Sequence, residues 1–215
     1  MNLRGMTINF LGDSITQGVG TTADSKRYFA LLQQAYGLKE ANGYGISGTR
    51  LAIQSVPSEN ASFDQHFASR IPEMKSADAV VVFGGTNDFG HGDAPIGTFA
   101  DRTPETFYGA CHDLCIKLIE RYPGKPIVFM TPLHRLDEQE ARVKHGKTVV
   151  LKSYVDIIRE VAEYYALPVC DLYRISGMQP AVPVIQETLI PDGLHPNDAG
   201  HEIIAARLGS FLASL

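Results

Sequence analysis

The sequence predicts an α/β fold of three layers, in which a parallel β-sheet is covered by helices on both faces. Short apolar runs alternate with helical patterns about five times along the 215 residues, and this alternation is typical of right-handed β-α-β units. The run Ala79–Phe83 is apolar throughout, as expected of a central parallel strand buried on both faces. No internal repeat, low-complexity tract or linker divides the chain, so residues 1–215 are predicted to form one domain.

Five strands are expected from the apolar runs and from their places between helices. The second of them, Glu40–Gly43, has poor strand propensity and is predicted from its position alone. The expected strands are Ile8–Leu11, Glu40–Gly43, Ala79–Phe83, Pro126–Met130 and Pro168–Leu172.

Apolar periodicity and end signals place the helices. Tyr28–Tyr36 has helical spacing and stops at Gly37, a residue suited to a helix C-terminus. In Thr103–Glu105, a threonine, a proline and an acidic residue follow one another as N-cap and first turn, which predicts a helix from there to about Tyr122. Further helices are expected at Phe67–Met74, from Val150 to Val161, and after Asn197, which can cap the last helix.

Composition and charge narrow the classes of partner. The formal net charge is −5 and no Lys- or Arg-rich run occurs, which argues against nucleic acid or an anionic membrane surface as the main partner. No apolar stretch is long enough to span a bilayer, and the run after the polar segment Met1–Thr7 is too short for a signal peptide. We therefore expect no membrane insertion and a cytoplasmic location, while the oligomeric state stays open.

The three cysteines do not form a disulfide framework. Cys111 and Cys115 lie four residues apart on the apolar face of a predicted helix, and Cys170 lies in a predicted strand. Core packing is therefore the favoured interpretation over a redox or metal role.

The segment Gly12–Gly18, with the sequence Gly-Asp-Ser-Ile-Thr-Gln-Gly, organises the rest of the chain. It follows the first strand, so Ser14 is expected at the carboxyl end of that strand, the edge where α/β sheets bind ligands. A serine hydroxyl becomes a nucleophile only with a base, a group that orients the base, and donors for the oxyanion.

His195 is the candidate base, and Asp192, three residues earlier, is the candidate orienting group. If the segment forms one turn, the carboxylate reaches one imidazole nitrogen and leaves the other for Ser14. The alternative is that His195 only packs at the start of the last helix.

Three donors could converge on an oxyanion: the Ser14 N–H, a glycine N–H and the Asn87 side-chain amide. Among the glycines we favour Gly48, with Gly45 as the competitor, because a glycine allows close approach of the backbone. A simple turn role is the alternative for Asn87.

Four blocks together resemble the SGNH (GDSL) hydrolase family: Gly12–Gly18, Gly48, the Gly-Thr-Asn-Asp of 85–88, and the Asp-x-x-His-Pro of 192–196. The resemblance implies a flavodoxin-like sheet of five parallel strands in the order 2-1-3-4-5. It implies Ser14 as nucleophile, His195 as base, Asp192 as its partner, and Ser14, Gly48 and Asn87 as oxyanion donors. It also implies that no cofactor or metal is needed.

Neighbouring polar residues allow two rival functions. Asp13, Asn87, Asp88, Asp192 and His195 are the ligand set that a metal-dependent phosphoesterase would use. Alternatively, the loop around Ser14 could bind phosphate in a non-catalytic module, although Asp13 would repel the anion and no Lys or Arg precedes Lys26 in this loop. Structural roles are favoured for Asp13 and Asp88. For His91, His134 and Arg135, on loops at the expected catalytic edge, the favoured interpretation is exposed loop residues without a substrate role, and contact with the substrate is the alternative.

The expected substrate is a small-molecule ester, and the loops at the strand ends are expected to form its pocket. These loops are 46–66, 86–102, 133–146 and 173–190. The last contains apolar residues that could contact a short acyl group: Met178, Pro180, Val182, Pro183, Val184 and Ile185. Because no amphipathic helix forms an evident lid, we expect acetyl or similarly short esters of a carbohydrate-like alcohol, with longer acyl chains, as in a lysophospholipase or thioesterase, as the alternative.

Overall fold

The computed structural model describes residues 1–215. Its main sheet has five parallel strands in the order β2-β1-β3-β4-β7, which is 2-1-3-4-5 when only these strands are counted, so the predicted fold class is confirmed. The strands of this sheet are β1 (Thr7–Gly12), β2 (Glu40–Gly45), β3 (Ala79–Phe83), β4 (Ile127–Met130) and β7 (Val169–Cys170). A separate antiparallel hairpin consists of β5 (Arg142–Lys144) and β6 (Lys147–Val149).

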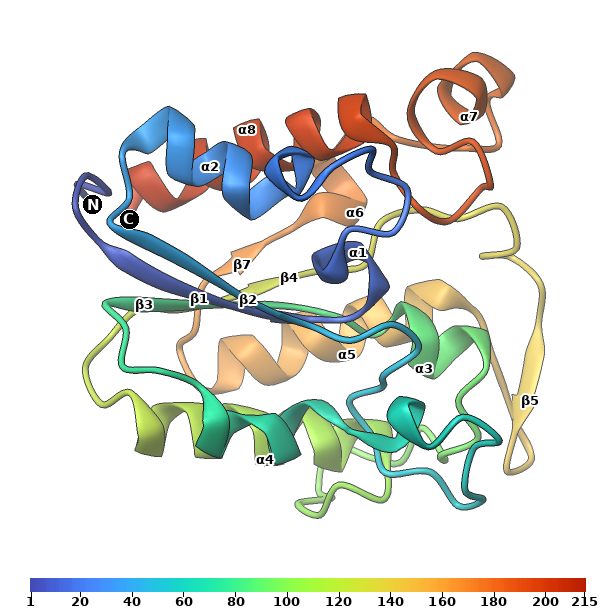
Figure 1. The fold of residues 1–215 in the computed structure, drawn as a ribbon. Helices are drawn as coiled ribbons and strands as arrows, with labels where there is room; N and C mark the ends of the chain where they lie inside the picture. Colours follow the sequence, from blue (N-terminus) through green and yellow to red (C-terminus); the bar gives the residue numbers. More distant parts are fainter.

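Helices cover both faces of the sheet. In Figure 1, α2 and α8 lie above it and α4 and α5 lie below it. The α-helices are α1 (Ser14–Gln17), α2 (Tyr28–Tyr36), α3 (Thr86–Gly90), α4 (Phe107–Arg121), α5 (Leu151–Tyr164), α6 (Leu172–Ile175), α7 (Pro183–Leu189) and α8 (Asp198–Ser214). The 3₁₀ helices are η1 (Asp24–Lys26), η2 (Ala61–Asp64) and η3 (Phe67–Glu73). No helix is both long and apolar enough to cross a membrane.

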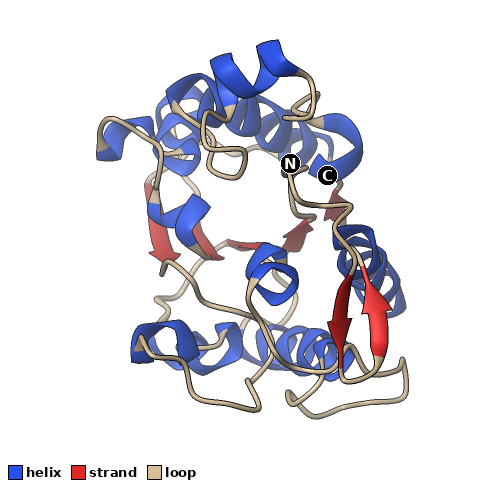
Figure 2. Ribbon diagram, turned by 90° about the vertical axis from the view of Figure 1, so that its right-hand side faces the viewer, coloured by secondary structure: helices blue, strands red, loops and turns tan.

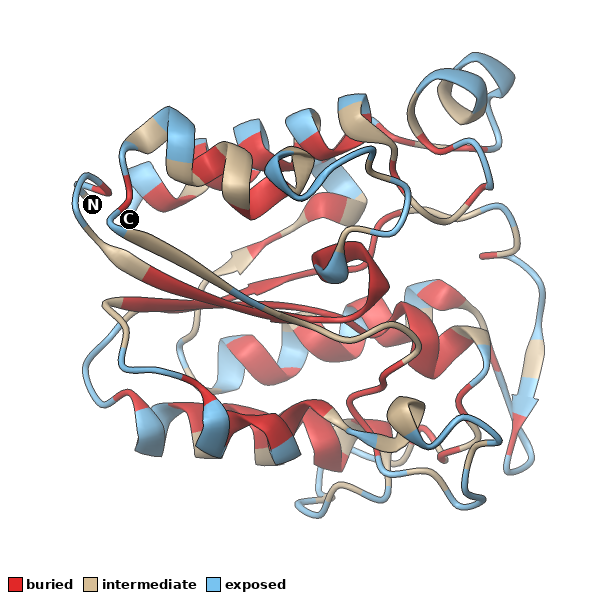
Figure 3. Ribbon diagram, viewed as in Figure 1, coloured by how far each residue is buried: buried red, intermediate tan, exposed pale blue.

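Side-chain alternation along the strands supplies two cores. In β3, Val80 and Val82 pack in the core on the side of α4 and α5, whereas Val81 and Phe83 pack in the core on the side of α2 and α8. Figure 3 shows the resulting pattern, with buried central strands and helices whose outer faces are exposed. Cys111, Cys115 and Cys170 are buried free thiols within these cores, as predicted.

The strand order brings distant loops together at one edge. β1 pairs with β2 on one side and with β3 on the other, and Gly12 is in register with both Gly45 and Phe83. The segments that follow these three strands carry Ser14, Gly48 and Asn87, so the fold places all three at the same edge. Figure 2 views the molecule from the side of these strand ends, with the β5–β6 hairpin at the rim.

The predicted start of the long fourth helix is wrong by one turn. α4 begins at Phe107, and its N-cap is Thr106, whose hydroxyl accepts a hydrogen bond from the Gly109 N–H. The Pro104 carbonyl instead accepts a hydrogen bond from Ile53 N–H at 2.7 Å, which ties the expected first turn to a different loop. Two threonines offered suitable caps, and tertiary hydrogen bonds selected the second.

Three regions expected to be loop or strand have a different structure. Residues 133–146 contain β5, the first strand of the β5–β6 hairpin. Residues 173–190 contain most of α6 and all of α7. The fifth strand is only Val169–Cys170, because α6 begins at Leu172. By contrast, α2 ends at Gly37 with φ +66°, and the Asn197 side chain caps α8 through the Gly200 N–H, both as predicted.

Candidate active site

The turn after β1 presents Ser14 at the edge of the sheet. Asp13 is the N-cap of α1, and its carboxylate accepts a hydrogen bond from the Ile15 N–H at 3.0 Å. Ser14 is therefore the first residue of a short helix, and it is almost fully buried with 6% of its surface exposed. The structural role predicted for Asp13 is confirmed, and burial raises the pKa of this carboxyl to about 7.

A single turn places His195 against Ser14. The Ser14 hydroxyl and His195 Nε2 lie 2.9 Å apart, and His195 Nδ1 lies 2.7 Å from an Asp192 carboxylate oxygen. The other Asp192 oxygen accepts the N–H groups of Leu194 and His195 at 2.9 and 2.6 Å, which holds the turn closed. Gly193, with φ +78°, provides the left-handed backbone that this turn requires.

The Asp192 carboxylate is held in its charged form. Partial burial raises its pKa, but the hydrogen bonds from the His195 and Leu194 backbone and from the imidazole outweigh burial, so the pKa lies below its usual range. A carboxylate at this position favours the imidazole tautomer with the proton on Nδ1. Nε2 is then a free acceptor that faces the Ser14 hydroxyl.

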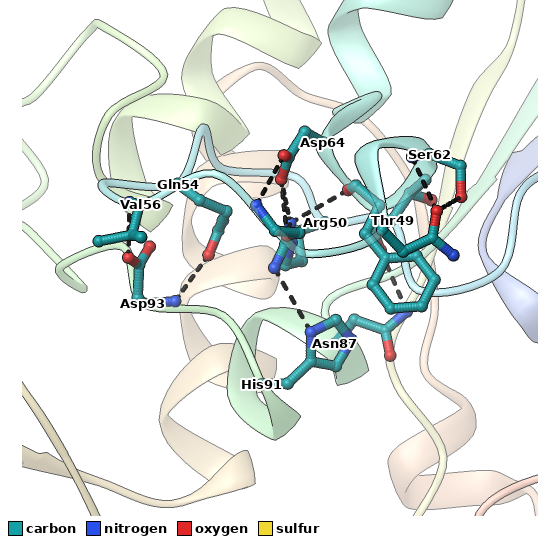
Figure 4. Close-up of polar contacts among 12 residues, drawn as sticks. Thr49, Arg50, Gln54, Val56, Ser62, Asp64, Asn87, His91 and Asp93 are labelled. Carbon is teal, nitrogen blue, oxygen red and sulfur yellow. Dashed lines mark hydrogen bonds and ion pairs between the residues drawn. The ribbon is translucent and has the colours of Figure 1, made fainter.

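Asn87 and Gly48 lie in the segments that follow the two strands flanking β1. Asn87 is in α3, directly after β3, and its side-chain amide donates to the Thr49 carbonyl at 3.1 Å (Figure 4). One amide hydrogen is used in this bond and the second stays free. Gly48 has φ +75°, and its N–H donates to no protein acceptor.

The packing of Gly45 distinguishes it from Gly48. A Cβ atom at Gly45 would lie 2.2 Å from the Gln17 nitrogen, so this glycine allows β2 to pass against α1. That close approach explains Gly45 as a packing residue and favours Gly48 as the candidate donor.

Two buried side chains connect the loops around Ser14. The Asp88 carboxylate accepts the N–H groups of Leu51 and Ala52, each at 3.0 Å. Arg70 in η3 donates to the Gly12 carbonyl at 2.9 Å, to the Tyr44 carbonyl at 2.7 Å and to the Thr49 hydroxyl at 3.2 Å. Asp88 was predicted to be structural, whereas Arg70 was not singled out, because an arginine within the short helix expected at Phe67–Met74 belongs to no recognisable motif.

The five residues of the metal-centre hypothesis are not arranged as ligands. Asp13 and Asp88 are used by backbone N–H groups, and Asp192 is used by His195. No group of three or more His, Cys, Asp or Glu side chains in the structure could hold a metal ion.

The loop residues His91, His134 and Arg135, for which no substrate role was favoured, have protein partners. His134 is bonded to Glu138, and Arg135 donates to the Thr86 carbonyl, one residue before Asn87. His91 lies beside Arg50 and the Phe63 ring. In the apolar 178–185 segment, Met178 and Pro180 are buried, so only its later residues are available at the surface.

A serine hydroxyl bonded to an imidazole, which is in turn bonded to a carboxylate, at the carboxyl ends of a parallel sheet, is the arrangement of α/β hydrolytic enzymes with a Ser-His-Asp triad. The sequence model of the GDSL-like Lipase/Acylhydrolase family matches residues 10–203. The chain therefore belongs to the GDSL-like lipase/acylhydrolase family, and the resemblance seen in its four sequence blocks is confirmed.

Solved structures repeat the fold over nearly the whole chain. A protein from Lactobacillus plantarum is 32% identical, with a TM-score of 0.83 and 98% of each chain covered. A member of the lipolytic G-D-S-L family from Veillonella parvula is 16% identical, with a TM-score of 0.68 and coverage of 97% and 99%. The acetyl xylan esterase AlAXEase is 22% identical, with a TM-score of 0.66 and coverage of 96% and 99%. At the last two identities the similarity shows the fold alone. No curated protein matches the sequence.

Proposed function

We propose that the protein is a serine esterase that hydrolyses carboxylic esters through an acyl-enzyme on Ser14. The observation that carries this proposal is the line of hydrogen bonds from Ser14 through His195 to Asp192, with distances of 2.9 and 2.7 Å. Family membership supports the hydrolase class.

In the first half of the reaction, His195 Nε2 takes the proton of the Ser14 hydroxyl as the oxygen attacks the ester carbonyl carbon. The negative charge on the carbonyl oxygen is stabilised by the N–H groups of Ser14 and Gly48 and by the free amide hydrogen of Asn87. The bond between the carbonyl carbon and the alcohol oxygen then breaks, and His195 returns the proton to the departing alcohol.

In the second half, a water molecule takes the place of the alcohol. His195 removes its proton, the resulting oxygen attacks the acyl carbon, and the bond to Ser14 breaks as the serine regains a proton. Asp192 keeps the imidazole oriented and stabilises its positive charge in both halves. No other group is required for this sequence.

We propose short acyl esters, with acetyl first among them, on a small carbohydrate-like alcohol. The surface hollows of about 470 to 670 Å³ are lined by other residues, not by Ser14, Asn87 or His195. One of them is the apolar groove between α2 and α8, which is lined by Leu31 and Ala205. Because the acetyl xylan esterase named above shares the fold, an acetylated sugar is a suitable test substrate.

Labelling of the serine tests the mechanism. Treatment with a fluorophosphonate, followed by peptide mass spectrometry, is expected to show one adduct, on Ser14, and EDTA is expected to leave esterase activity unchanged. Loss of activity in EDTA without an adduct would instead support the phosphoesterase hypothesis.

A series of chromogenic esters from acetyl to dodecanoyl tests the substrate. We expect kcat/KM to be highest at the acetyl end. Each methylene buried in a hydrophobic pocket stabilises binding by about 0.8 kcal/mol, so a deep acyl channel would produce a steep rise with chain length. A maximum at eight or more carbons would favour a lysophospholipase-like or thioesterase-like function.

A further inference from the structure

A short loop, residues 58–64, stands beside the candidate oxyanion site and is closed at its base. The Ser58 N–H donates to one Asp64 carboxylate oxygen at 2.9 Å, and the Ser58 hydroxyl donates to the other at 2.8 Å. Inside the loop, the Asn60 side chain accepts hydrogen bonds from the N–H and the hydroxyl of Ser62. These bonds cross-link the loop internally, so it is expected to hold one shape.

Arg50 ties this loop to the backbone that carries Gly48. Its side chain is buried, and one guanidinium nitrogen donates to the Ser58 hydroxyl at 2.6 Å, to the Asp64 carboxylate at 2.6 Å and to the Phe63 carbonyl at 3.2 Å. Figure 4 shows Arg50 between Asp64 and His91, with Thr49 and Asn87 close by. Since Arg50 follows directly after Thr49, the position of the 58–64 loop is fixed relative to the candidate oxyanion donors.

The loop places the Phe63 ring directly on Gly48. A Cβ atom at Gly48 would lie 2.3 Å from a ring carbon of Phe63, so the ring and the glycine backbone are in contact. The Phe63 ring also packs against His91, with 5.5 Å between the ring centroids. Phe63 and His91 thus form a wall beside Gly48.

The His91 ring in this wall is uncharged. Arg50 lies 3.4 Å from His91 Nδ1, and a cationic guanidinium can only donate, so this nitrogen is an acceptor without a proton. Partial desolvation of the ring, together with the positive charges of Arg50, Lys144, Arg135 and Arg142, lowers the pKa of His91 to about 4. The wall therefore presents two neutral rings.

The geometry of the proposed reaction determines which part of the substrate meets this wall. Of the four groups on the tetrahedral carbon, one is the Ser14 oxygen and one is the oxyanion, which faces Gly48 and Asn87. The alcohol oxygen must lie within reach of His195 Nε2, which protonates it. The remaining group, the acyl chain, must leave the carbon in a direction that none of these three takes, and the Phe63 ring contacts Gly48, one of the candidate donors that fix the position of the oxyanion.

We propose that Phe63 sets the acyl specificity by blocking chains longer than a few carbons, and that Arg50 is the positioning residue that holds it there. This inference rests on the proposed esterase function and names the side chain that limits its substrate. It assigns the 58–64 loop a role in selecting the acyl group.

The direct test compares kcat/KM for p-nitrophenyl acetate, butanoate and octanoate in the wild type and in Phe63→Ala. The ratio of octanoate to acetate is expected to rise about tenfold or more in the variant, because one or two methylenes in a hydrophobic pocket change kcat/KM by that order. Phe99→Ala is the matched control, since Phe99 is a half-buried loop residue that packs on His112 and Tyr164 instead. A ratio in Phe63→Ala equal to that of the control overturns the proposal.

Two further variants keep the proposal testable if Phe63→Ala does not fold. Phe63→Leu keeps most of the volume and is expected to shift the ratio of butanoate to acetate upward. Arg50→Lys removes the forked contact with the loop, and it is expected to shift both ratios in the same direction by a smaller factor while turnover of acetate continues. A loss of activity that is equal for all three esters in both variants would show a merely structural role and reject the proposal.

The outcome for the wild type separates this inference from the function beneath it. A wild-type enzyme that hydrolyses none of the three esters rejects the proposed esterase function, and one that hydrolyses octanoate best rejects the proposed short acyl group; either result rejects the inference as well. A wild-type enzyme that prefers acetate, combined with unchanged ratios in the Phe63 variants, rejects the inference alone.

Discussion

One side of the candidate site is a single turn in which Asp192 and His195 lie three residues apart and bond directly to each other. The other side is formed by Gly48 and Asn87, which follow different strands and whose loops are linked by hydrogen bonds of Asn87, Asp88 and Arg70. The first side depends on a short sequence pattern, and the second depends on the whole sheet edge. Mutations are therefore expected to act differently on the two sides.

The largest effect is expected for Asp192→Asn, on the local side. The amide would favour the wrong imidazole tautomer and remove the charge that stabilises the imidazolium, so kcat should fall about 10³- to 10⁴-fold. Steady-state kinetics on p-nitrophenyl acetate measure this loss. Asp198→Asn is the control. Asp198, the first residue of α8, accepts hydrogen bonds from Thr22 and makes none with His195. Full activity in Asp192→Asn would remove Asp192 from the mechanism.

A smaller loss is expected for Asn87→Ala, on the distributed side. Removal of one oxyanion donor typically lowers kcat by about 10²- to 10³-fold, with little change in KM, since the bond is strongest in the transition state. Because the Asn87 amide also donates to the Thr49 carbonyl, the variant removes the candidate oxyanion donor and this structural hydrogen bond together. Asn42→Ala, in β2, is the control. An unchanged kcat with a raised KM would show that Asn87 binds substrate or forms a turn only.

The same contrast explains what the sequence predicted and what it missed. Ser14, Asp192 and His195 could be grouped from a strand-end motif and a three-residue spacing, and the strand order then follows from the family resemblance. Phe63 and Arg70 could not be found, because their importance comes from contacts with residues far away along the chain, which no local pattern signals. The start of α4 was misplaced for a related reason, since the competing caps Thr103 and Thr106 differ in their tertiary partners and not in local chemistry.

Two buried groups, His201 in α8 and Asp88 in α3, affect the free energy of unfolding in opposite directions when they take up a proton. On the side of α8, burial lowers the pKa of His201 to about 4. On the side of α3, burial raises the pKa of Asp88 to about 6. Between these values the unfolded chain protonates its histidine before the folded chain does, whereas the folded chain protonates Asp88 before the unfolded chain does. The two contributions to the free energy of unfolding therefore oppose each other as the pH falls.

His201→Gln separates the two contributions and is expected to have the smallest effect on activity at neutral pH. His201 is fully buried, and its Nδ1 accepts the Tyr28 N–H at 3.0 Å, a bond that the glutamine carbonyl can replace. The folded-state pKa lies below the value of 6.5 expected in the unfolded chain, so His201 destabilises the wild type progressively as the pH falls from 6.5 to 4. At 1.36 kcal/mol per pKa unit, the wild type should lose about 3 kcal/mol relative to the variant over this range. Urea unfolding of both proteins at pH 7, 5.5 and 4 measures the difference, and a constant difference would show that His201 takes up its proton equally in the folded and unfolded states.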